Sequence, residues 1–166
     1  ISLSYEVYKN LSVGITGKLL YEKIYIDEAS GFGMDFGANY MVNNFSFAAV
    51  ISNLGSMNAL KNSETELPTS LRFGASYVYK KDNFSVTGAV DGFKVLDGGN
   101  FHGHFGAEGG FKDFIFIRAG YMTGYDNKGF TAGVGFKYNS LYLDYAFQTH
   151  STGFGSGNSI SLGYNF

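Results

Sequence analysis

The segment FTAGVGFKYNSLYLDYAF, residues 130–147, consists of two alternating runs joined by a short polar turn. Apolar and aromatic residues occupy every second position of each run, and mostly small or polar residues fall between them. A period of two is typical of β-strands, because successive side chains point to opposite faces. Asn139 and Ser140 separate the runs, and asparagine suits the positive φ of a tight turn. The segment therefore predicts an antiparallel hairpin with one apolar and one polar face.

The same alternation recurs along almost the whole chain, and a helical period is nearly absent. We therefore predict an all-β, antiparallel, up-and-down fold of about eleven strands in one domain, residues 1–166. The predicted strands are 1–8, 11–26, 31–42, 45–53, 69–80, 84–94, 101–112, 115–123, 129–138, 141–149 and 158–166.

The predicted connections alternate between short and long. A soluble β-sandwich has no reason to sort its loops in this way, whereas an outer-membrane β-barrel has short periplasmic turns and longer outer loops. The short turns are Lys9-Asn10, Asn43-Asn44, Lys81-Asp82, 112–114 and Asn139-Ser140, and the longer loops are 27–30, 54–68, 95–100, 124–128 and 150–157.

The composition also favours a transmembrane β-barrel in the bacterial outer membrane. Charged residues make up 16% of the chain, below the quarter or so that is usual in soluble domains. No run of about 18 apolar residues is present, so the sequence predicts no transmembrane helix. Because eight strands already fill a barrel interior, a larger barrel with its apolar face inward would leave space unfilled. We therefore expect the apolar face to meet outer-membrane lipids and the polar face to line a wet lumen.

Aromatic residues gather beside the short turns, as in the aromatic girdle of a membrane barrel. The alternative is a soluble β-sandwich or a lipocalin-like barrel. The net charge of −2 argues against nucleic acid as a partner, and the absence of cysteine excludes disulfides and thiolate metal sites. The girdle residues are Tyr8, Tyr40, Phe45, Tyr79, Phe84, Phe111, Phe114 and Tyr138.

Charged residues on the polar face are predicted to pair across hairpins. Counting outward from the turns at 81–82 and 112–114 sets two arginines opposite two acids, at a distance where opposite charges neutralise each other. The pairs either fix the strand register or form a selectivity surface, and we favour the structural role. The pairs are Arg72 with Asp91 and Glu108 with Arg118, and Lys18, Asp35, Lys137 and Asp144 also point inward.

Two features could carry chemistry. His102 and His104 share a face at a spacing that can hold a metal, but no third ligand is evident nearby. His150 and Ser151 are neighbours in a predicted loop, where adjacent side chains point apart, so they do not suit a catalytic triad. We therefore expect no catalytic residue, no metal and no cofactor. An outer-membrane hydrolase around His150 is the enzymatic alternative.

The last predicted strand ends on Phe166, which resembles the terminal aromatic by which barrel-assembly machinery recognises its clients. Single-chain bacterial barrels have an even number of strands, and a membrane does not tolerate an open sheet edge. An odd count therefore predicts strands upstream of Ile1. A second chain that closes the sheet, or a miscount in residues 1–8, is the alternative.

A series of motifs runs in order along nearly the whole chain. They are GKLLYEKI (17–24), GFGMDFGANYMV (31–42), ISNLGS (51–56), ELPTSLRFGASY (66–77), FGAEGG (105–110), IRAGY (117–121), LDYAF (143–147) and ISLGYNF (160–166). In this order they resemble the PorV/PorQ proteins, a FadL-like outer-membrane group.

The resemblance implies a barrel of roughly 14 strands with an N-terminal plug, of which this chain would supply the last part. It implies a non-enzymatic accessory or cargo-handling component of type IX protein secretion to the cell surface. We expect loops 54–68 and 150–157 to bind a protein partner. The alternative is a FadL-like transporter or pore for small hydrophobic solutes. The family pattern and the hairpin count name the same pair, Glu108 and Arg118.

Overall fold

The computed structural model describes residues 1–60, 63–150 and 155–165 of the chain. Within these residues all helical or extended structure is β-strand. None of the described residues belongs to a helix that is long and apolar enough to cross a membrane. The strands are β1 (Ser2–Tyr8), β2 (Leu11–Ile24), β3 (Asp27–Val42), β4 (Phe45–Leu60), β5 (Ser63–Glu66), β6 (Ser70–Lys81), β7 (Phe84–Val95), β8 (Phe101–Phe111), β9 (Ile115–Thr123), β10 (Lys128–Tyr138), β11 (Leu141–His150) and β12 (Ser156–Tyr164).

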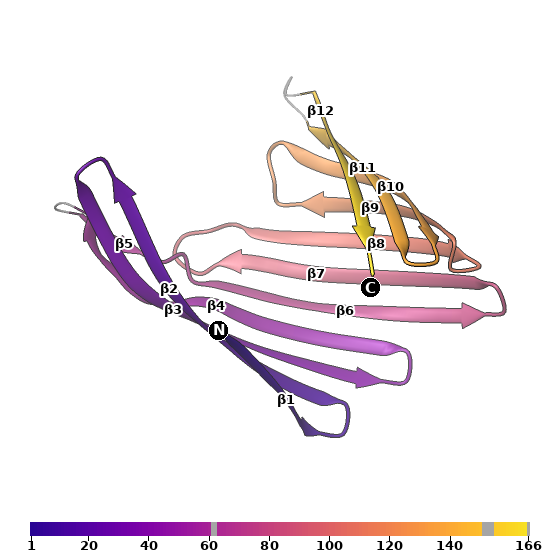
Figure 1. The fold of residues 1–166 in the computed structure, drawn as a ribbon, viewed down its shortest axis with the longest axis horizontal. Coiled ribbons are helices and arrows are strands. Elements are labelled where there is room, and N and C mark those ends of the chain that lie inside the picture. The colour runs from indigo at the N-terminus through magenta and orange to yellow at the C-terminus, as the bar shows by residue number, and fades with distance from the viewer. Residues whose placement is uncertain (61–62, 151–154, 166) are drawn as a thin grey trace. The chain divides into compact units, whose positions relative to one another are not determined.

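Strands that are neighbours in the sheet follow each other in the sequence, so the predicted all-β, up-and-down fold class is confirmed. The hydrogen-bonded order is β1-β2-β3-β4-β6-β7-β8-β9-β10-β11-β12, and β5 pairs with β4 beside this path. Figure 1 shows successive strands running to and fro. The chain divides into two compact units, Ile1–Gly74 with Phe93–Phe101 and Ala75–Gly92 with His102–Phe166. Each of the polar clusters on these strands lies within one unit.

Tight turns rich in Asn and Asp occur at every second connection, as predicted. Asn10, Asn43, Asp82 and Asn139 have φ angles of 66°, 52°, 52° and 52°. This left-handed region is least strained for glycine, and asparagine and aspartate tolerate it better than other side chains. The turn after β6 consists of Asp82 and Asn83, one residue later than the sequence count assumed.

The other connections contain more strand than was predicted. Residues 27–30 belong to β3 and pair with β2 as far as Ile24 and Asp27, so Tyr25 and Ile26 alone form the turn. β4 continues to Leu60 and pairs with β5, within the predicted loop 54–68. The strict alternation of short and long connections is therefore wrong. Small and polar residues lie on both faces of these extensions, so the period of two fades although the backbone pairing continues.

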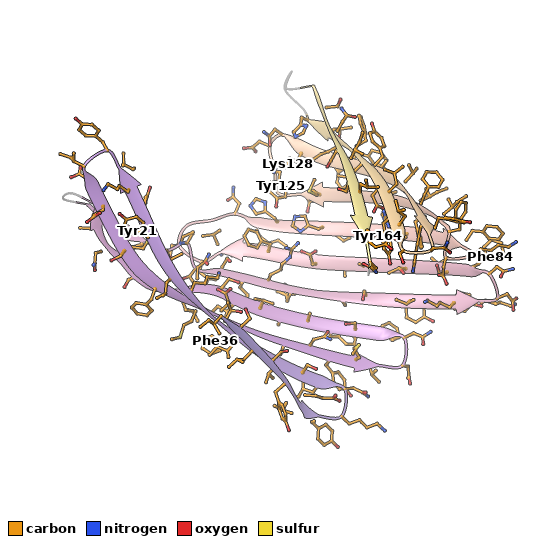
Figure 2. The ribbon with its side chains drawn as sticks, in the orientation of Figure 1. Tyr21, Phe36, Phe84, Tyr125, Lys128 and Tyr164 are labelled. Carbon is orange, nitrogen blue, oxygen red and sulfur yellow. The ribbon has the colours of Figure 1, made fainter. Side chains whose placement is uncertain are left out.

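The strands lack the apolar core that a water-soluble domain of this length has. Among the described residues Ala29, 3% exposed, is the one buried hydrophobic residue, and no large side chain is fully buried. Aromatic side chains stay exposed instead, for example Phe84 at 62% and Tyr164 at 60% (Figure 2). A soluble chain of this size buries roughly two thirds of its surface on folding. The apolar face therefore requires lipid, as the strands of outer-membrane barrels do.

Candidate functional site

Three polar clusters lie on the face opposite these apolar side chains. The first joins Glu108 on β8, Arg118 on β9 and Asp144 on β11. The register of β8 and β9 sets Glu108 directly opposite Arg118, which is the partner that the hairpin count gives. The Nε of Arg118 donates to Oε2 of Glu108 at 2.5 Å, and its Nη1 donates to Oδ1 of Asp144 at 2.5 Å. Arg118 therefore binds carboxylates on two different strands.

The side chain of Arg118 reaches Asp144 by crossing β10 at a glycine. Gly135 is the register partner of both Phe116 on β9 and Asp144 on β11. A Cβ atom on Gly135 would lie 2.5 Å from Oδ1 of Asp144 and 3.0 Å from Nη1 of Arg118, so a larger residue would displace the ion pair. The three charged side chains are 32–41% exposed, and each pair contributes about 1 kcal/mol or less because water screens it.

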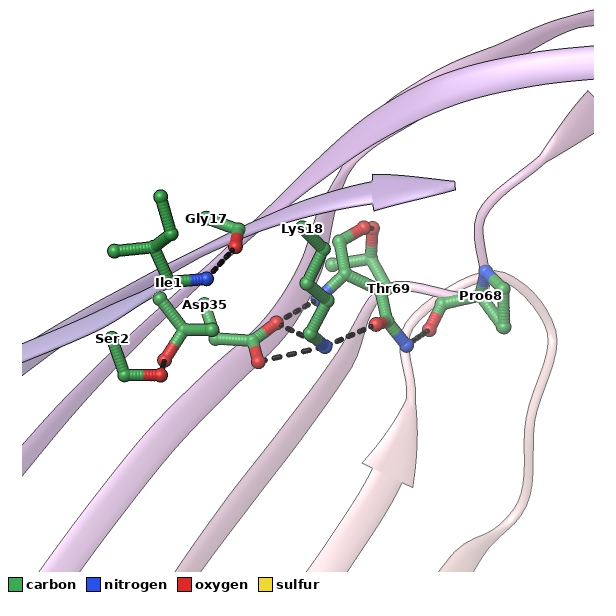
Figure 3. A network of polar contacts seen from close by, with 9 residues as sticks. Ile1, Ser2, Gly17, Lys18, Asp35, Pro68 and Thr69 are labelled. Atoms are coloured by element: carbon green, nitrogen blue, oxygen red, sulfur yellow. Dashed lines mark hydrogen bonds and ion pairs between the residues drawn. The ribbon is translucent and has the colours of Figure 1, made fainter. Parts of the chain in front are cut away.

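The second cluster joins β2, β3 and β4 (Figure 3). The Nζ of Lys18 lies 2.8 and 2.7 Å from the two carboxylate oxygens of Asp35, and it donates to Oδ1 of Asn53 at 3.0 Å. The register of β3 and β4 shifts between Met34 and Phe36, which marks a β-bulge. At this bulge Asn53 adopts a φ of 63° and donates its backbone N–H to Oδ1 of Asp35 at 2.9 Å. The bulge therefore directs both the backbone and the side chain of Asn53 into the cluster.

Asn53 also holds the segment that leads into β6. Its Nδ2 donates to the carbonyl oxygen of Pro68 at 3.2 Å, and the hydroxyl of Thr69 donates to the carbonyl oxygen of Asn53 at 3.0 Å. The carbonyl oxygen of Thr69 accepts the backbone N–H of Leu96 at 2.8 Å. One asparagine therefore connects an ion pair between two strands with the chain segment before β6.

The third cluster joins β7, β8 and the connection after β9. The Nδ1 of His104 lies 2.8 Å from Oδ1 of Asp91, and its Nε2 lies 2.9 Å from the hydroxyl of Tyr125. Tyr125 stacks on His102 with ring centres 3.9 Å apart, and the Nζ of Lys128 lies 5.3 Å from the Tyr125 ring centre (Figure 2). Both nitrogens of His104 are therefore occupied by protein partners. Among the described residues, no group of three or more His, Cys, Asp or Glu could hold a metal ion.

Two further predicted site residues lie on β6 and β10. Lys137 places its ammonium nitrogen 5.4 Å from the ring centre of Tyr142, a cation–π contact. Arg72 belongs to β6. Its pairing with Asp91 stays a prediction, because the count that set the two residues opposite each other assumed the turn one residue too early.

The predictions for the C-terminal part fall partly outside the described residues. Phe166 and Ser151 lie outside the described residues, so the assembly signal and the prediction for His150 and Ser151 stay predictions. His150 itself is the last residue of β11, and its backbone N–H donates to the carbonyl oxygen of Gly155 at 3.2 Å.

Three residues that organise the clusters were not predicted from the sequence: Asn53, Gly135 and Tyr125. Asn53 had a usable signal nearby, because a glycine inside a strand pattern, here Gly55, often marks a bulge. Gly135 precedes Lys137 on the polar face of β10. A glycine at such a position lets a long side chain from one neighbouring strand reach the other. No local signal identifies Tyr125, since its role depends on a connection folding back onto β8.

The three clusters neutralise charge and hold strands together. Asp35, Glu108 and Asp144 each accept a hydrogen bond from a cation, so each carboxylate already has a partner. The acid–histidine pair of Asp91 and His104 ends on a tyrosine hydroxyl. A Ser-type triad would need a nucleophile at that position, with an oxyanion site beside it. In this arrangement the tyrosine hydroxyl occupies the second nitrogen of His104.

Comparison with known proteins gives one family. No curated protein matches the chain. A family model described as type IX secretion system membrane protein PorP/SprF matches residues 8–164. The match supports the link to type IX secretion that the motifs suggested, but it does not confirm the PorV/PorQ assignment. Together with the all-β fold and the uncovered apolar face, the match supports a location in the bacterial outer membrane. The chain belongs to the PorP/SprF family of type IX secretion system membrane proteins.

Proposed function

We propose that this protein is a non-enzymatic component of the type IX secretion system that handles cargo on its way to the cell surface. The observation that carries the proposal is the family match over residues 8–164. In this proposal the tight turns face the periplasm and the other connections face the outside, as in outer-membrane barrels. A protein partner binds at the outer connections, where cargo or surface machinery is within reach.

The polar face supports a role without catalysis. Its carboxylates are held by Lys18, Arg118 and His104, which leaves the clusters with fixed geometry and few reactive groups. A face of this kind lines a hydrated interior or contacts another protein without bonding to it covalently. Handling a protein substrate without catalysis needs only such a surface. Hydrolysis would need in addition a nucleophile and a base that converge on one point.

A FadL-like path for hydrophobic solutes is the alternative, and the position of the apolar cavity argues against it. A hollow of about 720 Å³ is lined by residues of β1 to β4 and by Leu71. Its aliphatic walls, such as Ile15 and Ile51, belong to the apolar face, because Phe36 pairs with both of them. Lipid tails reach this face, whereas a solute path through a barrel would need an apolar pocket on the polar face.

The test is deletion of the gene and re-expression of the full-length protein in the native cell. We expect deletion to retain type IX cargo inside the outer membrane and re-expression to restore it at the surface. Surface labelling of cargo in intact cells, compared with total cargo after lysis, measures this. A second outer-membrane protein that does not depend on type IX secretion serves as the control for general envelope damage.

If the protein transports solutes instead, deletion is expected to affect solute uptake and not the delivery of cargo. If deletion left surface cargo unchanged but lowered the uptake of a labelled fatty acid, the secretion role would be wrong and the transporter role would be supported. Purified full-length protein in planar bilayers separates the two further. A steady conductance, together with unchanged cargo delivery, would identify a pore.

A further inference from the structure

The hairpin of β2 and β3 is longer than a membrane requires. β2 has 14 residues and β3 has 16, and they pair without interruption from Leu11↔Tyr40 to Ile24↔Asp27. A tilted transmembrane strand needs about 9–11 residues. If the turn at Lys9-Asn10 lies at one membrane surface, residues 21–30 extend beyond the other. We call residues 21–30 the projecting hairpin; Figure 1 shows it as the long ribbon formed by the ends of β2 and β3.

The end of the projecting hairpin is apolar and exposed. The turn consists of Tyr25 and Ile26, whose side chains are 90% and 76% exposed. Ile24 precedes them and is also exposed. A hairpin end in water usually carries Asn, Asp and Gly, which solvate well and fit the turn. Apolar residues at this point have no packing role within the hairpin.

Tyr25 also occupies a backbone conformation that suits it poorly. Its φ is 57°, in the left-handed region, where the Cβ atom of a residue other than glycine comes too close to the backbone. At the same first position of other two-residue turns the chain has Asn43, Asp82 and Asn139. This turn therefore has a strained tyrosine at the position where other turns of the chain have asparagine or aspartate. Strained residues of this kind concentrate at functional sites.

The flanks of the projecting hairpin are acidic. They carry Glu22, Asp27 and Glu28 against Lys23, which gives three acids and one base. Glu28 is occupied, since it accepts the hydroxyl of Tyr21 at 2.8 Å and lies 3.7 Å from the Nζ of Lys23. In the described part of the chain no ion pair involves Glu22 or Asp27. Two carboxylates therefore stand beside the apolar end with no ion pair to any described residue.

We propose that the end of this hairpin is a docking site for a protein whose apolar cleft, rimmed by Lys or Arg, receives Tyr25 and Ile26. Aromatic anchors that enter a pocket dominate protein interfaces, and the acidic flanks select a basic rim. Lipopolysaccharide is the other large species at the outer surface. Its phosphates would repel Glu22 and Asp27, so the charge favours a protein. This inference rests on the proposed function and orientation.

The test uses a photoreactive benzoylphenylalanine in place of Ser30, which is exposed on the projecting hairpin and outside its end. Irradiation of cells that express the full-length protein is expected to give one discrete protein adduct, with Lys or Arg near the crosslinked site by mass spectrometry. Adding Tyr25→Asn with Ile26→Gly creates a favourable hairpin turn and is expected to lower the adduct yield at least about tenfold. Adding Glu22→Lys with Asp27→Lys is expected to lower it likewise.

The matched control places the same Asn-Gly pair at the other end of the strands, as Lys112→Asn with Asp113→Gly. These two residues have φ angles of 52° and 50°, so the new turn fits, and the adduct yield is expected to stay unchanged. No adduct, an adduct with lipopolysaccharide, or a protein adduct insensitive to the Tyr25 and Ile26 changes would overturn the inference. If gene deletion blocks cargo delivery but the Tyr25→Asn, Ile26→Gly variant delivers normally with its adduct intact, the docking site fails and the proposed function stands. If deletion has no effect on cargo, the proposed function itself fails.

Discussion

At the scale of single residues, Arg118 and Asn53 each connect elements that a hairpin count treats separately. Arg118 binds Glu108 on the neighbouring strand and Asp144 beyond β10. Asn53 binds Lys18, Asp35 and the segment before β6. The contact of Arg118 with Asp144 depends on the missing side chain of Gly135, and the contacts of Asn53 depend on the bulge between β3 and β4. The contribution of each residue to the unfolding free energy can be measured with a substitution and a matched control variant.

Gly135→Ala is expected to remove the Arg118–Asp144 ion pair, because the new Cβ atom would lie within 3.0 Å of both charged groups. The expected loss in unfolding free energy is up to about 1 kcal/mol, the usual range for a partly exposed pair. Urea unfolding of the full-length protein in lipid vesicles measures it. In an Asp144→Ala background the same substitution should cost nothing further. Gly109→Ala is the control, since a Cβ there has no neighbour within 4 Å. Equal costs in both backgrounds would contradict the assignment.

Asn53→Ala is expected to cost about 2 kcal/mol, because it adds left-handed strain and removes side-chain hydrogen bonds. Asn53→Gly keeps the backbone conformation without strain and should cost about half as much. The difference between the two variants isolates the backbone contribution at φ 63°. Equilibrium unfolding in vesicles gives both values. If the glycine variant were as unstable as the alanine variant, the positive φ would not matter.

The sequence predicted the contacts that a short turn determines. Glu108 and Arg118 flank one tight turn, so counting outward from it gives their register. Asp144 lies on β11, and its contact with Arg118 depends on the length of the arginine and on the missing side chain of Gly135. A pattern of period two carries no information on side chains that cross a strand. The contact between His104 and Tyr125 escaped prediction for another reason, because it depends on the connection after β9 folding back onto β8.

At the scale of elements, the pairing of β3 with β4 depends on a close approach near the bulge. A Cβ atom on Gly55 would overlap the carbonyl oxygen of Phe32 and lie 2.9 Å from the Cα atom of Gly33. Both neighbours are backbone atoms, which cannot turn aside as a side-chain end can. The sequence indicated the strands but not this approach, because glycines are frequent throughout the chain. The start of β3 escaped prediction for a related reason: its first residues, 27–30, carry small and polar side chains on both faces, whereas the length of β2 was predicted.

Gly55→Ala is expected to destabilise the pairing of β3 and β4 by about 1–3 kcal/mol, the range for overpacking against a fixed backbone. Hydrogen exchange of the full-length protein in micelles should show faster exchange in residues 31–34 and 54–57, which pair at this point. Gly17→Ala on β2 is the control, because a Cβ there meets nothing within 4 Å and exchange should not change. Equal exchange in the two variants would show that the strands can move apart at no cost.

At the scale of the whole molecule, the absence of a core from the described residues decides the environment. The alternation and low charge content predicted a membrane strand pattern, and the exposed aromatic face bears this out. The family match adds the secretion system, which no periodic pattern could supply. The total number of strands in the complete barrel stays a prediction, because pairing within this chain does not determine it.

Full-length protein is expected to fold only in detergent or lipid, since none of the described residues covers its apolar face. In micelles its circular dichroism should show β-structure, and unheated samples should migrate differently from boiled samples on a denaturing gel, because folded barrels resist the detergent. Dilution into detergent-free buffer should precipitate it, since exposed patches this large drive aggregation. Boiled and unheated samples of a soluble β-protein of similar size serve as the control for the gel shift. A monomeric, soluble and β-structured protein without detergent would contradict the lipid-facing assignment of the apolar face, and with it the orientation on which the docking site of the projecting hairpin depends.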